Sequence, residues 1–144
     1  MKKILLSLLT VLFLGVILNC SSMPDKNPHL QRQWMMVSFD GFSKDQLIAN
    51  KAEINLTSSV VNGEIQGSAY MGCNRMTFTS KFKKGGKVKI SQGASTMKAC
   101  EDVKLETAFQ KKFETMTKYS IEGHFLTLSD GKGNTMKFVA ADWD

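Results

Sequence analysis

Apolar residues form one nearly continuous block near the start of the chain and occur in short alternating runs after it. The block extends from Ile4 to Leu18 and follows two lysines, Lys2 and Lys3. It is shorter than the about 20 residues that a helix needs to cross a bilayer, and a basic start before a short apolar run is typical of a secretory signal peptide. We therefore predict a removable leader over residues 1–19.

After residue 32 the pattern changes to a period of two, which is typical of strands with one buried face. Ala52, Ile54 and Leu56 alternate with polar residues. The Asn62-Gly63 pair that follows them is the strongest short hairpin signal in the chain. The alternation and the turn residues between the runs predict strands over residues 33–39, 51–61, 64–70, 76–82, 88–90, 119–121, 125–128 and 136–139.

Residues 102–118 are the segment with a helical period. Apolar residues recur there at spacings of three and four, whereas lysines and glutamates occupy the opposite face. Glu101 and Asp102 stand where acidic residues stabilise the start of a helix, and Lys118 stands at its end. The apolar positions of the predicted helix are Leu105, Ala108, Phe109, Phe113 and Met116.

Short strands with one amphipathic helix predict an α+β domain over residues 33–142. A curved antiparallel sheet or an incomplete β-barrel, with the helix packed on its open side, would bury the apolar faces of both. A chain of 144 residues is long enough for one such domain and not comfortably for two. Aromatic and β-branched residues occur along its whole length, which excludes a disordered protein.

The leader ends in Ile17-Leu18-Asn19-Cys20, which resembles the lipobox of bacterial lipoproteins. In those proteins the cysteine thiol receives a diacylglycerol, and cleavage leaves the cysteine as the first residue. The resemblance implies a membrane anchor at Cys20, because a triacylated cysteine carries more than the two chains that stable anchoring needs. Residues 20–32 would then form a polar tether. An ordinary signal peptide with an incidental cysteine, or an uncleaved anchor, is the alternative.

The residue after the cysteine bears on the compartment. Ser21 is not the aspartate that retains lipoproteins in the inner membrane of enteric bacteria. By that resemblance we expect a protein of the bacterial cell envelope, anchored in the outer membrane.

Cys73 and Cys100 remain as a pair once Cys20 is acylated. The compartment beyond the inner membrane is oxidising in many bacteria, and disulfides persist there. We therefore expect a disulfide between Cys73 and Cys100, which would tie the end of the first hairpin to the start of the helix. Two buried free cysteines that act as small apolar residues are the alternative.

Two short elements carry a resemblance to a known family. Gly72-Cys73-Asn74 follows the Asn-Gly hairpin, and Thr96-Met97-Lys98-Ala99-Cys100 precedes the helix. With Trp34 at the start of the domain, this order resembles the META/HslJ family of small bacterial envelope proteins over nearly all of residues 30–140. The resemblance implies an incomplete β-barrel with a helix across it, and an association with heat-shock response and antibiotic tolerance. The motif residues are Gly72, Cys73, Asn74, Thr96, Met97 and Cys100.

Little in the chain points to catalysis. It lacks the glycine-rich motifs that bind nucleotides and the nucleophile motif of hydrolases, so we expect no cofactor. Cys73 and Cys100 have no histidines at zinc-ligand spacing, so we expect no metal site. A cysteine-dependent enzyme would need a dyad of Cys73 and His124, which has no local signature. For Asn74 a structural role at a strand end is the expectation.

The expected function is therefore that of a non-enzymatic binding or stress-tolerance module whose partner is a protein or a lipid. The alternative is a carrier or chaperone of a lipid or lipoprotein that uses the barrel interior. An open apolar interior would favour the carrier, and a filled interior would favour a module that binds through its surface.

The formal net charge of the chain is +6, a basic balance below that of typical nucleic-acid-binding domains. The envelope location also argues against nucleic acid as a partner. Lysines gather around Gly85-Gly86 in a predicted hairpin, where they form either a solvated tip that resists aggregation or a contact with anionic headgroups or polymers. Each charge that reached such a surface would contribute about 1 kcal/mol. These residues are Lys81, Lys83, Lys84, Lys87 and Lys89.

Overall fold

The computed structural model describes residues 27–143, which form an antiparallel sheet of nine strands with two helices. The predicted leader and Cys20, the predicted site of acylation, lie outside the described residues. Within residues 27–143 no helix has the length and apolar character needed to cross a membrane. The elements are β1 (Gln33–Phe39), α2 (Lys44–Ala49), β2 (Glu53–Asn55), β3 (Val60–Val61), β4 (Glu64–Tyr70), β5 (Arg75–Lys83), β6 (Lys87–Ser95), α3 (Lys104–Phe113), β7 (Lys118–Glu122), β8 (Phe125–Ser129) and β9 (Thr135–Ala140).

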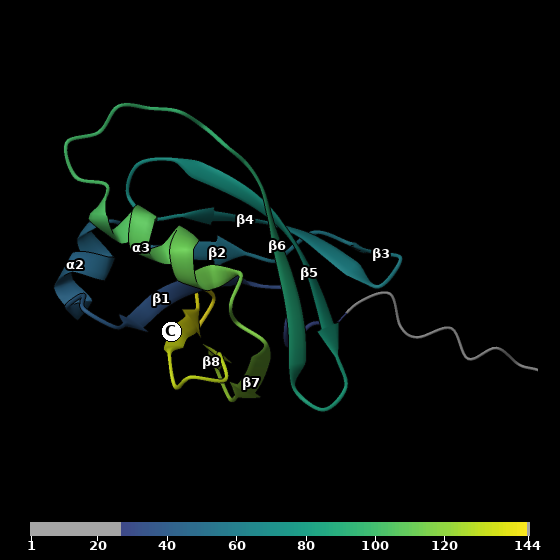
Figure 1. Ribbon diagram of the computed structural model, residues 1–144. Helices are drawn as coiled ribbons and strands as arrows, with labels where there is room; N and C mark the ends of the chain where they lie inside the picture. The colour runs from purple at the N-terminus through teal and green to yellow at the C-terminus, as the bar shows by residue number, and fades with distance from the viewer. Residues whose placement is uncertain (1–26, 144) are drawn as a thin grey trace, which may run out of the picture.

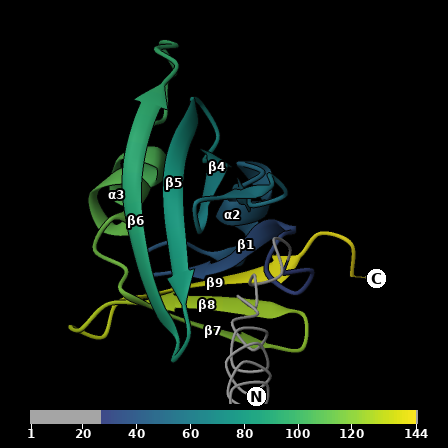
Figure 2. The same ribbon diagram turned by 90° about the vertical axis from the view of Figure 1, so that its right-hand side faces the viewer.

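The sheet closes on itself as a barrel, which Figure 1 and Figure 2 show from two sides. The strand order is β2-β1-β9-β8-β7-β6-β5-β4-β3, and β2 also pairs with β4, with Ile54 opposite Ala69. Eight strands form the ring, and the two-residue β3 stays outside it.

The closure corrects part of the predicted fold. The curved antiparallel sheet and the helix packed on it are confirmed, but the sheet closes into a barrel of eight strands where an incomplete barrel was the other expectation. The strand that closes it, β2, is three residues long and pairs along both of its edges. Alternating burial shows which face of a strand is covered, but it does not show how many edges are paired.

The barrel is least closed between β6 and β7, and α3 lies across this opening (Figure 1). The two strands share one paired position, Lys87 with Lys118. Farther along β6, hydrogen bonds to α3 and its C-terminal turn replace those of the sheet. The Gln92 backbone N–H donates to a carboxylate oxygen of Glu114 at 2.6 Å, and the Gln92 side chain donates to the carbonyl of Gln110 at 2.5 Å.

The interior of the barrel is packed with large apolar side chains. Trp34 and Phe138 have no exposed surface, and the indole N–H of Trp34 donates to the carbonyl of Leu30 at 2.9 Å. Phe109 and Phe113 of α3 stack on each other with ring centroids 4.4 Å apart. The other large, fully buried side chains are Leu47, Ile54, Leu56, Met71, Met116, Leu126, Leu128 and Met136.

Several local features differ from the sequence prediction, among them β6, which continues to Ser95 although the predicted strand ends at residue 90. Helix α2 was not predicted, because a helix of six residues is too short to show a periodic pattern, although a capping box between Ser43 and Gln46 marks its start. The predicted strand over 51–61 is divided into β2 and β3 at a turn, where the Asn55 side chain accepts hydrogen bonds from Thr57. Helix α3 is shorter than predicted, because it runs from Lys104 to Phe113 and the chain then turns before β7 begins at Lys118.

We predict that Phe109→Ala lowers the free energy of unfolding by about 3–5 kcal/mol, because it leaves a cavity between the helix and the sheet. Urea denaturation of the variant and the wild type measures the difference. The exposed Thr107 of the same helix provides the control variant Thr107→Ala, which we expect to stay within about 0.5 kcal/mol of wild type. A loss below about 1 kcal/mol for Phe109→Ala would show that α3 does not complete the core.

Candidate functional site

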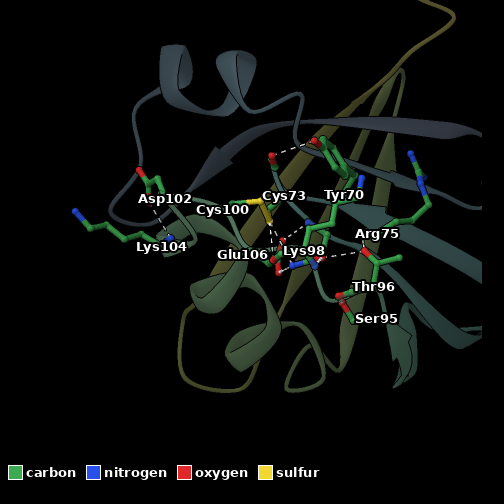
Figure 3. Close-up of a disulfide and its surroundings, with 12 residues drawn as sticks. Tyr70, Cys73, Arg75, Ser95, Thr96, Lys98, Cys100, Asp102, Lys104 and Glu106 are labelled. Atoms are coloured by element: carbon green, nitrogen blue, oxygen red, sulfur yellow. Dashed lines mark hydrogen bonds between the residues drawn. A yellow bond between two sulfur atoms is a disulfide. The ribbon is translucent and has the colours of Figure 1, made fainter.

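The predicted disulfide is present between Cys73 and Cys100, with the two Cα atoms 6.1 Å apart. Figure 3 shows it between the turn after β4 and the segment that leads into α3. Cys73 is buried, whereas Cys100 lies in the exposed segment 96–103. The bond therefore fastens this exposed segment to the end of the barrel. We call this region the disulfide junction, formed by Gly72, Cys73, Asn74, Thr96, Cys100 and Glu106.

A buried carboxylate lies beside the disulfide, and Asn74 satisfies it. The backbone N–H of Asn74 donates to one carboxylate oxygen of Glu106 at 2.6 Å, and its side-chain amide donates to the other at 2.9 Å. The amide oxygen of Asn74 accepts from the hydroxyl of Thr96 at 2.9 Å and from the backbone N–H of Lys98 at 2.7 Å. Asn74 thus has a structural role, but not the one expected for it, because it is not in the left-handed conformation and its partners lie in α3 and in the segment before it instead of in its own backbone.

The remaining motif residues also have structural explanations, except one. Gly72 has a φ of 106°, and a Cβ there would lie 2.1 Å from the side-chain oxygen of Asn50. Met97 extends outward with 98% of its surface exposed, and it lies between the two residues that Asn74 holds. The structure therefore brings five of the six motif residues together as a joint in the fold, whereas Met97 points away from it.

The structure does not place the candidate catalytic groups as a dyad. Cys73 is bonded to Cys100, and the ring of His124 stacks on Trp143 at a centroid distance of 4.9 Å. Among residues 27–143 no group of three or more histidine, cysteine, aspartate or glutamate side chains is placed to hold a metal ion.

The predicted lysines of the β5–β6 hairpin lie at the end of the hairpin that points downward in Figure 2. Their strand positions face outward, because the residues between them, such as Val88 and Ile90, are buried in the core. Lys118 of β7 joins them across the opening of the barrel. We call this surface the lysine face, formed by Lys81, Lys83, Lys84, Lys87, Lys89 and Lys118.

The sheet sets several of these lysines directly opposite one another. The paired positions are Lys81 with Lys89, Lys83 with Lys87, and Lys87 with Lys118. Like charges at opposed positions on neighbouring strands destabilise a sheet. Sequence reasoning found the first five lysines but not Lys118, because it lies 29 residues beyond Lys89 and only strand pairing brings it near.

Contacts with Tyr119 hold the lysine face in place. Its ring meets that of Phe82 edge-on at 4.9 Å, its backbone N–H donates to the carbonyl of Gly86 at 2.8 Å, and its hydroxyl donates to the carbonyl of Lys83 at 3.3 Å. Gly86 has a φ of 70°, and a Cβ there would lie 2.8 Å from the carbonyl oxygen of Tyr119. The end of the hairpin is therefore attached to β7, while Lys83, Lys84, Lys87 and Lys89 remain exposed to solvent.

The lysine face surrounds an open hollow of about 340 Å³. Four of its lysines line the hollow together with Val88 and Thr117. The ion pairs found among residues 27–143 involve Arg32, Arg75 and Lys112, so none of them neutralises the lysine face. Clustered ammonium groups around a hollow can bind an anion through several contacts at once.

Comparison with known proteins identifies the domain but not a ligand. The family model of the META domain matches residues 28–143. A DUF4847 family protein from Bacteroides vulgatus has a similar crystal structure, with a TM-score of 0.52 and 12% sequence identity over 79% of this chain and 95% of that one. Similarity at this identity supports the fold alone. No curated protein matches this chain.

We predict that removing the disulfide, by Cys73→Ala together with Cys100→Ala, lowers the free energy of unfolding by about 3–4 kcal/mol. The bond joins residues 27 positions apart, and in the chain-entropy model a loop of that length gives this range. Urea denaturation of the oxidised wild type, the reduced wild type and the double variant provides the measurement. Equal transition midpoints with and without a reductant would contradict the prediction.

Proposed function

The chain belongs to the META domain family, and from this premise we propose that it is a non-enzymatic binding module, anchored in the cell envelope, that contacts anionic surfaces through its lysine face. The single observation that carries this proposal is the register of the lysines. Three pairs of like charges stand opposite one another, and no ion pair within residues 27–143 relieves them. An anionic headgroup or polymer would relieve that repulsion and gain about 1 kcal/mol per contacting lysine.

The proposed anchor rests on the sequence. Cys20 follows a basic start and a short apolar run, at the offset that the lipobox of bacterial lipoproteins requires. Acyl chains on Cys20 would keep the domain close to a membrane of the envelope, in the outer membrane by the resemblance at Ser21. Attachment at short range raises the effective concentration of the lysine face at that surface, so weak individual charge contacts suffice.

Packing of the barrel supports a module that binds through its surface over a lipid carrier. A carrier would need an apolar interior open to its cargo, whereas here Trp34, Phe109 and Phe138 are among the side chains that occupy the interior. The hollow at the lysine face lies outside the barrel wall, next to charged groups.

We predict that Cys20→Ser moves the protein from the detergent phase to the aqueous phase, or leaves its leader uncleaved, because no thiol remains to be acylated. Detergent-phase partitioning of envelope extracts, combined with mass spectrometry of the N-terminus, measures both effects. A wild-type N-terminus without acyl chains would contradict the proposed anchor.

For the lysine face we predict that Lys83→Gln, Lys87→Gln and Lys89→Gln together weaken binding of residues 27–143 to phosphatidylglycerol vesicles by roughly a hundredfold, at about 1 kcal/mol per charge. Vesicle co-sedimentation measures the affinity, and rising salt should release the wild type.

The matched control removes three exposed lysines elsewhere, through Lys104→Gln, Lys111→Gln and Lys132→Gln. It lowers the net charge by the same amount and should weaken binding much less. Equal losses in the two triple variants would show that net charge alone, and not the lysine face, attracts the domain to the surface.

A further inference from the structure

A second hollow, of about 330 Å³, lies on the outer surface of the barrel over β1, β8 and β9. Val37, Phe125 and Val139 form its floor, and each of them is partly exposed. Trp143 stands at one side, and two lysines, Lys44 and Lys137, line it as well. We call this hollow the aromatic groove. None of these residues belongs to the lysine face or the disulfide junction.

A β-bulge in β1 gives the groove its shape. Met36 pairs with Phe138 and Ser38 with Lys137, so Val37 is an extra residue in the ladder. As a result Val37 and Ser38 both face outward, while Met36 before them is buried in the core. A bulge redirects side chains at the cost of regular pairing, and bulges are frequent next to functional sites.

Trp143 is held in place at the edge of the groove although 48% of its surface is exposed. His124 stacks against its ring at 4.9 Å with an angle of 18° between the planes, and Phe125 meets it edge-on at 6.0 Å. The backbone N–H of Trp143 donates to the carbonyl of Ala140 at 3.2 Å. Because the ring is already positioned, a ligand that packs against it loses little additional conformational entropy in the protein.

Within residues 27–143 the charged residues that line the groove, Lys44 and Lys137, are both positive. The ammonium group of Lys137 lies 4.4 Å from the centre of the Phe125 ring. Neither Lys137 nor Lys44 forms an ion pair within residues 27–143. An apolar floor beside two available ammonium groups is complementary to a molecule with an apolar body and one negative charge.

We propose that the aromatic groove binds a small amphipathic anion, namely an aromatic ring or short alkyl chain that bears a carboxylate. A hollow of about 330 Å³ is at the lower end of the range for small-molecule pockets, and it is too small for a folded partner to enter. The apolar part of the ligand packs on Val139 and Phe125 against Trp143, and the carboxylate meets Lys44 and Lys137. This site is independent of the proposed contact at the lysine face.

The test uses 2-naphthoate and its uncharged counterpart 2-naphthamide as probes. Each is titrated by calorimetry into the full chain in nanodiscs of neutral phosphatidylcholine, with empty nanodiscs as the blank. We expect wild type to bind the naphthoate about tenfold more tightly than the amide. Trp143→Ala should weaken both probes, and Lys44→Gln with Lys137→Gln should remove the preference for the acid while leaving the amide unchanged.

Lys111→Gln, at an exposed position of α3, is the control and should change neither affinity. Equal affinity for the acid and the amide in wild type, or probe binding that Trp143→Ala leaves intact, would overturn the proposal. Self-association of the wild type in sedimentation that Trp143→Ala abolishes would also overturn it, because the groove would then hold a second copy of the chain.

Discussion

The hydrogen bonding of the buried Glu106 carboxylate is the constraint on which the rest of the structure depends. Burial of a carboxylate is costly unless donors surround it, and Asn74 supplies one donor from its backbone and one from its side chain. The same side chain holds the segment before α3 through Thr96 and Lys98. Asn74 therefore holds both α3 and the segment that precedes it. The adjacent disulfide adds a covalent link at the same place.

The disulfide junction fixes the position of α3, and α3 in turn fills the interior of the barrel. The helix lies over the weak seam between β6 and β7 and brings Phe109 and Phe113 into the core. With the interior packed in this way, the hollow at the lysine face and the aromatic groove are the candidate binding surfaces among residues 27–143. The two hollows described above differ in character, since one is lined mostly by lysines and the other has an apolar floor.

Much of the fold could be predicted from local pattern. The alternation of Ala52, Ile54 and Leu56 corresponds to buried positions, and the left-handed Asn62-Gly63 pair forms the predicted turn. The disulfide partners followed from the number of cysteines and an expected oxidising compartment. Closure of the barrel could not be predicted, because the pairing of β2 with β4 joins strands whose edges carry no distinguishing side-chain pattern.

The sequence by itself determined the strands, the amphipathic helix, the cysteine pair and a run of lysines, since each is a local spacing of residue types. Only the tertiary structure determined which residues lie opposite those lysines on neighbouring strands and which distant residues belong to the same surface. Lys118 lies opposite Lys87 because β6 and β7 pair at that one position. Val37 and Trp143 line the same groove because the bulge in β1 turns Val37 outward and the chain after β9 brings Trp143 beside it. Strand register creates such neighbours, and register depends on how the whole sheet closes around its core.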